Sequence, residues 1–150
     1  MAAGTFTLYD TVAELLGDGT IDLDTNTFKL MLATSSYTPS AAHDEYADVS
    51  GAEVANGNGY TTGGQALTTV TWSQTSGVAT FDSDDVVWTA SGGSITARYA
   101  VLYDDTSTGD KLIGYVLLDT TPADVTATDG NTLTIAPSAN GWFQQTVNPA

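Results

Sequence analysis

The chain has 150 residues, of which 18 are acidic and three are basic, giving a formal net charge of −15, and it contains no cysteine. This length fits a single domain, residues 1–150, with a buried core. The charge disfavours nucleic acid and anionic membranes as partners, because phosphate groups are bound by clustered Lys and Arg. The lack of cysteine excludes disulfides, thiolate metal sites and cysteine nucleophiles.

Residues 1–26 are predicted to form an N-terminal arm that contains one short helix. Thr11 precedes the apolar sequence VAELLG, and Glu14 follows at the spacing of a capping box. Gly17 supplies a stop signal. The helix has only about two turns, so it must pack on another part of the chain to be stable. Its predicted buried stripe consists of Val12, Leu15 and Leu16.

Residues 28–32 are predicted to form a half-buried strand, because Phe28, Leu30 and Leu32 alternate with two other residues. Residues 35–64 follow with little periodicity and many Gly, Ser, Asn and Ala residues. We expect a long loop here, with a short helix in the sequence HDEYADV as one option. Loops of this length are often functional or contact a partner.

From Gln65 onward, all the patterns indicate β structure. Seven to nine short apolar segments are separated by turn sequences such as TSG, SGG and TDGN at intervals of roughly 8–12 residues. The predicted fold class is therefore all-β and mainly antiparallel, a jelly-roll-like β-sandwich with one short N-terminal helix and a long loop at 35–64. The strand order stays open, so an immunoglobulin-like sandwich is the alternative.

Catalytic and metal-binding patterns are weak throughout the chain. The one histidine, His43, lies in the predicted loop, where we expect a solvated side chain, and no GxSxG sequence is present. Residues 22–26 begin like a calcium-binding EF-hand loop. That pattern fails because Thr27 and Ala33 occupy the positions that require Gly and Glu. We therefore predict no catalytic residue, no metal and no cofactor. The acidic sequence DSDD is expected to be a solvated turn, and its alternative is a cation site to which another loop adds oxygen ligands.

The three tryptophans permit two interpretations. Trp72 and Trp88 each end an alternating segment, and Trp142 lies near the C-terminus. Aromatic rings can stack on sugars, but packing in the core or against another subunit is the favoured interpretation.

The only arginine, Arg98, lies within the apolar sequence ITARYAVLYDD. Strict alternation places it on the less apolar face of one continuous strand. Its guanidinium group needs a carboxylate partner. The sequence DDVVWTA is expected to form a hairpin with this strand, so the candidates are Asp84, Asp85 and Asp119. A contact with another subunit is the alternative.

Several stretches together resemble a group of small structural proteins of tailed bacteriophages. They are FKLMLATSSYTP, GNGYTTGGQAL, TFDSDDVVWTA, SITARYAVLYDD and LIGYVLLD, within residues 5–136. The resemblance implies a non-enzymatic decoration (cement) protein on the capsid exterior. It also implies a homotrimer and the major capsid protein as partner.

Two segments are candidates to reach neighbouring subunits, namely the N-terminal segment and the loop 35–64, although both could pack within one subunit. The alternative function is a tail or fibre protein that binds host-surface glycans through Trp72, Trp142 or Tyr60. A polysaccharide-cleaving enzyme with paired carboxylates is a weaker hypothesis. The predicted interface residues are Phe6, Leu8, Tyr9, Tyr37, Tyr60 and Arg98.

Overall fold

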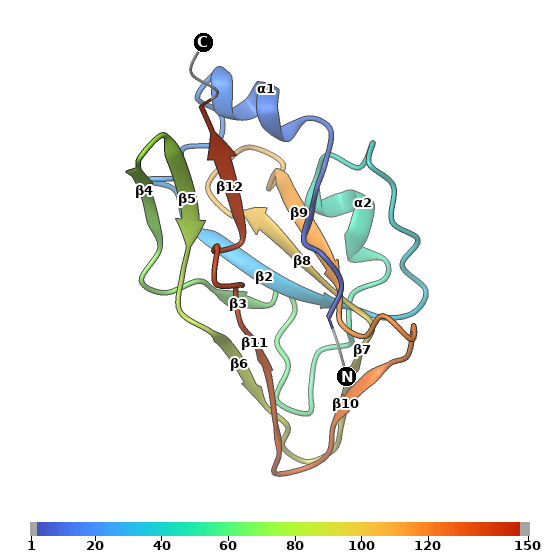
Figure 1. Cartoon of the computed structure of the whole chain (residues 1–150). Helices are drawn as coiled ribbons and strands as arrows, with labels where there is room; N and C mark the ends of the chain where they lie inside the picture. Colours follow the sequence, from blue (N-terminus) through green and yellow to red (C-terminus); the bar gives the residue numbers. More distant parts are fainter. Residues whose placement is uncertain (1–2, 148–150) are drawn as a thin grey trace.

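The computed structural model describes residues 3–147 and is mostly antiparallel β, as predicted, with two short helices (Figure 1). The helices are α1 (Val12–Gly17) and α2 (Tyr46–Ser50). The strands are β1 (Thr7–Leu8), β2 (Phe28–Ala33), β3 (Gln65–Ala66), β4 (Thr71–Thr75), β5 (Val78–Asp82), β6 (Val86–Thr89), β7 (Ile95–Ala97), β8 (Tyr99–Asp104), β9 (Leu112–Leu117), β10 (Val125–Ala127), β11 (Thr132–Ile135) and β12 (Phe143–Thr146).

A five-stranded antiparallel sheet forms the centre of the molecule, with the strand order β1-β9-β8-β2-β3. Both faces of its middle strands are covered. Met31 on β2 is fully buried, like its neighbours Leu30 and Leu32, so the prediction of a half-buried strand was wrong. Alternate residues of β2 enter two different apolar clusters, because successive side chains of a strand point to opposite faces.

The remaining strands form three smaller sheets: β12-β5-β4, β6 with β11, and β7 with β10. The last two pairs lie at one end of the molecule, at the bottom of Figure 1. The predicted hairpin between the segments before and after SGG is therefore wrong, because β6 pairs with β11 and β7 pairs with β10. Instead, the turn after β6 lies against the turn before β11, where Ala90 N–H donates to the Asn131 carbonyl at 2.8 Å.

Arg98 lies at a bend between β7 and β8, not inside one continuous strand. The bend changes the phase of the alternation. Ile95 and Ala97 before it share the larger apolar cluster with Ala100 and Leu102 after it. Strict alternation would have placed these two pairs on opposite faces. The chain thus passes at Arg98 from the pair with β10 into the five-stranded sheet.

The N-terminal arm packs along the central sheet. Gly4 N–H donates to the Leu117 carbonyl at 2.7 Å, and Tyr9 N–H donates to the Ile113 carbonyl at 3.1 Å. Helix α1 forms where it was predicted, but without the capping box. The Thr11 hydroxyl donates instead to the Asp44 carboxylate at 3.0 Å, which ties the start of the helix to the long loop.

Candidate functional site

The long loop lies against the end of β2, where Glu53 bridges to Ala33, and the Glu53 carboxylate holds the loop in shape. This carboxylate accepts hydrogen bonds from the Tyr46 hydroxyl at 2.5 Å, the Tyr60 hydroxyl at 2.6 Å and Gly63 N–H at 2.6 Å. The Tyr60 oxygen also accepts from Leu32 N–H at 3.0 Å. Burial, and secondarily the bond to Glu53, raises the pKa of both tyrosines. We call this group, Glu53 with Tyr46, Tyr60 and Gly63, the loop edge.

A second aromatic group connects the loop to the start of the chain. The Tyr9 and Tyr37 hydroxyls are 2.6 Å apart, and the Tyr37 hydroxyl lies 3.3 Å from Nδ1 of His43. His43 is half-buried against these two rings, so the expected solvated histidine is wrong. Burial raises the pKa of Tyr9. These groups hold the loop to the body of the same chain.

All three basic side chains form ion pairs within the chain. Arg98 Nε lies 2.7 Å from Asp124. None of the three predicted partners, Asp84, Asp85 and Asp119, pairs with Arg98, so that prediction was wrong. Lys29 pairs with Asp105 at 3.0 Å. Lys111 bonds two carboxylates, and they raise its pKa. Its partners are Asp44 at 2.6 Å and Glu45 at 2.9 Å. The cations are thus engaged internally, and the outer surface is strongly acidic.

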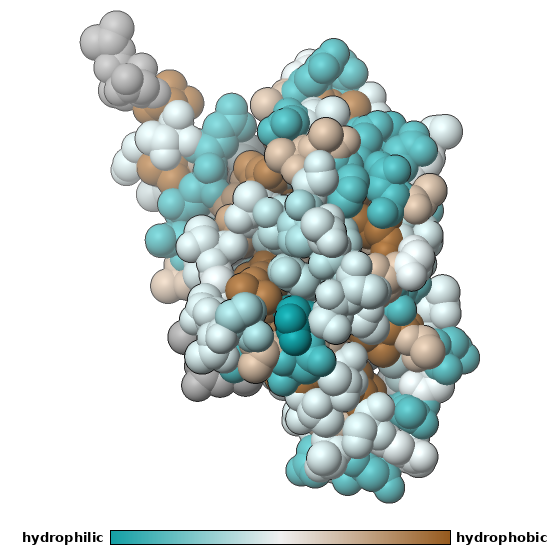
Figure 2. All heavy atoms as spheres, turned by 90° about the vertical axis from the view of Figure 1, so that its right-hand side faces the viewer, coloured by the Kyte–Doolittle hydropathy of each residue, from teal (hydrophilic) through white to brown (hydrophobic). Residues whose placement is uncertain are grey.

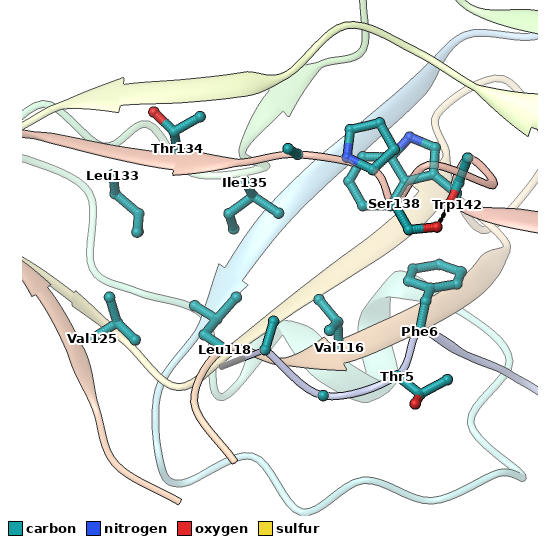
Figure 3. A pocket seen from close by; sticks show the side chains of 15 residues that line it. Thr5, Phe6, Val116, Leu118, Val125, Leu133, Thr134, Ile135, Ser138 and Trp142 are labelled. Atoms are coloured by element: carbon teal, nitrogen blue, oxygen red, sulfur yellow. Dashed lines mark hydrogen bonds between the residues drawn. The ribbon is translucent and has the colours of Figure 1, made fainter. Parts of the chain in front are cut away.

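At the opposite edge of the central sheet, an apolar groove of about 640 Å³ opens to solvent. Its walls come from the N-terminal arm, the end of β9, the start of β10, β11 and the segment that leads to β12 (Figure 3). None of its lining residues is charged, in a chain of net charge −15. They are Ala3, Gly4, Thr5, Phe6, Val116, Leu118, Val125, Leu133, Thr134, Ile135, Ala136, Pro137, Ser138, Gly141 and Trp142.

The groove is a place where the larger apolar cluster reaches the surface. Leu133 and Ile135 point from β11 toward Val116 and Leu118, while Thr134 points away (Figure 3). The four apolar residues keep exposed fractions of 6–8 %, whereas Leu30, Leu32 and Ile113 in the middle of the central sheet have 0 %. At one end, the Phe6 ring lies against Trp142, with ring centres 5.6 Å apart.

The six predicted interface residues are spread over the molecule. Phe6 alone lines the groove, whereas Leu8 on β1 is 38 % exposed and is not among the lining residues. Tyr9, Tyr37 and Tyr60 are buried and hydrogen-bonded within the chain, and Arg98 pairs with Asp124. Tyr60 therefore presents no free ring face for a sugar.

Sequence reasoning missed the β9 and β11 side chains that line the groove. One signal was present: residues 1–9 and 130–150 contain no charged side chain, although acidic residues are frequent between them. These two uncharged ends of the sequence meet at the groove. Their proximity depends on the strand order, which the sequence patterns did not supply.

Within residues 3–147, no group of three or more His, Asp or Glu side chains is placed to hold a metal ion. Asp84 in the acidic sequence DSDD accepts a hydrogen bond from the Thr69 hydroxyl at 2.6 Å, which fixes a loop. Among the helices of this part of the chain, none is long and apolar enough to cross a membrane.

A smaller hollow of about 250 Å³ lies beside Trp72, which is half-buried with its ring centre 6.1 Å from that of Phe143. Asp22 and Gln145 also line it, and both are exposed. An aromatic ring beside a carboxylate and an amide offers groups that can contact a sugar.

Comparisons with protein-family models, with curated proteins and with solved structures found no match to this chain.

Proposed function

We propose that the chain is a decoration (cement) protein on the capsid exterior of a tailed bacteriophage. It acts without catalysis, as a homotrimer, and stabilises the head by bridging subunits of the major capsid protein. The resemblance of residues 5–136, above all GYTTGG and the stretch DDVVWTA to TARYAVLY, supports this function. The same proposal includes a jelly-roll-like sandwich as the arrangement of the sheets.

The uncharged groove is the observation that carries this proposal. It presents aliphatic and aromatic side chains and no acid, base or nucleophile pair, so its chemistry suits binding and not turnover. A protein that bridges shell subunits gains stability for the shell because it binds the assembled state in preference to separate subunits. Three copies of the contact in a trimer would act together.

The internal use of polar groups supports a rigid bridging body. Arg98, Lys29 and Lys111 are paired inside the chain, and the Glu53 carboxylate is fully used in holding the long loop. A body with a fixed loop loses little conformational freedom when it binds, and this favours affinity.

Cosedimentation with purified particles tests the proposal. The chain is mixed with expanded capsids and, separately, with DNA-free precursor shells of the phage that encodes it. We expect binding to expanded capsids only, together with a higher melting temperature of the capsid. Fractionation that finds the chain in tails and not in heads would contradict the proposal.

The hollow beside Trp72 favours a second candidate function, a tail or fibre protein that binds host-surface glycans. Trp72 and Asp22 would supply the stacking and hydrogen-bonding groups. A glycan array tests it: binding that is lost in Trp72→Ala and kept in Trp72→Phe supports this function. Absence of binding by the wild-type chain removes it.

A further inference from the structure

The groove is bounded on one side by β11 and on the other by residues 3–6 of the arm, which lead into β1. β11 has a hydrogen-bonded partner on one side only, because it pairs with β6 alone. Thr134 lines the groove although its side chain points away, so the β11 backbone itself forms part of the wall (Figure 3). Strands of this kind can pair with a further strand through their free N–H and C=O groups.

The side chains in the groove have the spacing of an extended peptide. Val116 and Leu118 are two residues apart on one wall, and Leu133 and Ile135 are two residues apart on the other. In an extended peptide, every second side chain points to the same side. A segment with alternate apolar residues therefore fits between the two pairs.

Charge narrows the chemistry of the occupant. The lining contains no charged residue, so an occupant that placed a charge in the groove would lose its hydration without gaining a partner. Outside the groove, the chain has a net charge of −15, which favours basic residues on either side of the bound segment.

A second copy of this chain is a poor occupant. Within residues 3–147, only three large hydrophobic side chains are exposed, namely Leu8, Val87 and Val147. They lie on β1, on β6 and just after β12, far apart in the sequence. The surface seen in Figure 2 is accordingly polar over most of its area, with apolar atoms in small separate patches. The arm does carry alternate apolar residues, Phe6 and Leu8, but it is hydrogen-bonded to β9 of its own chain. Outside the arm, residues 9–147 offer no exposed segment in which large apolar side chains alternate.

We infer that the groove binds an extended, uncharged segment of a different protein, whose alternate apolar side chains enter between β11 and the end of β9. Under the proposed function, on which this inference rests, that protein is the major capsid protein. The contact would be a strand added to the groove wall, and it would leave the loop edge unchanged.

A synthetic peptide tests this inference on the full chain. The probe is the capped peptide KTVTVTVTK, and the matched control is KTTTTTTTK, in which threonine replaces each valine with little change in shape. Methyl NMR signals of Val116, Leu118 and Ile135 should shift saturably with the valine peptide. The threonine peptide should bind roughly tenfold more weakly or not at all.

Substitutions at one exposed lining residue provide the second readout. Ala136→Trp adds a large ring to the groove wall and Ala136→Asp adds a charge there, and the exposed position favours normal folding of both variants. Each should weaken binding of the valine peptide by roughly tenfold or more. Ala55→Trp, at an exposed residue of the long loop, is the matched control and should bind like the wild-type chain.

The peptide experiment would overturn the inference if the methyl signals do not shift up to about 2 mM valine peptide, if both peptides bind equally, or if the Ala136 variants bind as the wild-type chain does. Concentration-dependent shifts of the same signals without peptide would show a second copy in the groove and would also overturn it. Capsid binding separates this test from that of the proposed function. If the valine peptide binds but capsids do not bind the chain, only the proposed function fails. If capsids bind both Ala136 variants with the affinity of the wild-type chain, only the inference fails.

Discussion

The two edges of the five-stranded sheet are closed in different ways. At the edge formed by β2 and β3, the long loop covers the core, and Glu53 holds the loop in shape by accepting three hydrogen bonds from groups of the same loop. At the β1 edge, the arm covers β9 but leaves the groove, where core side chains remain open to solvent. The comparison shows that the chain is long enough to cover an edge of the sheet, because 30 residues, 35–64, cover the first edge and form additional polar bonds there. The groove at the second edge therefore stays open for a reason other than chain length.

The largest expected effect is the loss of stability when an apolar side chain is truncated, and this loss should be larger in the closed core than in the groove. Ile113 on β9 is fully buried, and Ile135 on β11 lines the groove with an exposed fraction of 8 %. We expect Ile113→Ala to lower the free energy of unfolding by about 4 kcal/mol and Ile135→Ala by about 2 kcal/mol, because a solvent-open site leaves a smaller cavity. Urea denaturation measures both. Equal losses would show that the groove is closed in solution.

Removal of the negative charge at the loop edge is expected to have the next largest effect. Glu53→Gln replaces one acceptor oxygen by an NH₂ group that faces other donors, so a tyrosine hydroxyl or Gly63 N–H loses its partner. The expected loss is about 3 kcal/mol in the free energy of unfolding. Glu14→Gln on α1, at an exposed glutamate, is the matched control and should change stability little. A loss below about 1 kcal/mol for Glu53→Gln would contradict the role of the Glu53 hydrogen bonds in holding the long loop in place.

Displacement of the arm tests the other edge. A Cβ atom at Gly114 would lie 2.6 Å from the Phe6 ring and 2.7 Å from the Thr7 carbonyl oxygen, so Gly114→Ala must push the arm off β9. We expect a loss of about 2 kcal/mol in the free energy of unfolding and faster hydrogen exchange of the Gly4 and Tyr9 amides.

The matched control for the arm is Gly17→Ala, because no atom lies within 4 Å of its added Cβ. Its stability should stay within about 0.5 kcal/mol of wild type. Unchanged exchange of the arm amides in Gly114→Ala would contradict the described packing.

The smallest expected effect is the pH dependence of the cap of α2, which belongs to the long loop. The Asp48 carboxylate accepts from the backbone N–H groups of Asp44 and Glu45, and these bonds lower the pKa of Asp48. A lowered pKa in the folded state stabilises the fold above the unfolded value of about 3.9, and this contribution is lost as the pH falls toward the folded value.

Asp48→Asn should therefore be less stable than wild type by up to about 1 kcal/mol at about pH 6, and the difference should shrink toward about pH 2. Urea denaturation at both pH values measures it. Asp10→Asn, at an exposed aspartate of the arm, should show no such trend. A difference that does not depend on pH would contradict the capping role of Asp48.

The all-β class and the place of α1 could be predicted, because alternation and helix signals are local. The pairing of β6 with β11 could not, since it joins segments more than 40 residues apart and competes with a local hairpin that the SGG turn also favours. The partner of Arg98, Asp124, could not be predicted either, because a one-residue bend at Arg98 reversed the alternation on which the prediction depended. The groove depends on the strand order and was not predicted; of the residues that line it, only Phe6 was among the predicted interface residues.

Hydrogen–deuterium exchange of the chain, free and bound to expanded capsids, tests most directly whether the groove is the contact surface. The account predicts new protection in residues 3–8 and 131–138, which come from the two ends of the sequence, and unchanged exchange in residues 45–64. Protection confined to residues 45–64, with the groove segments exchanging as in the free chain, would contradict it.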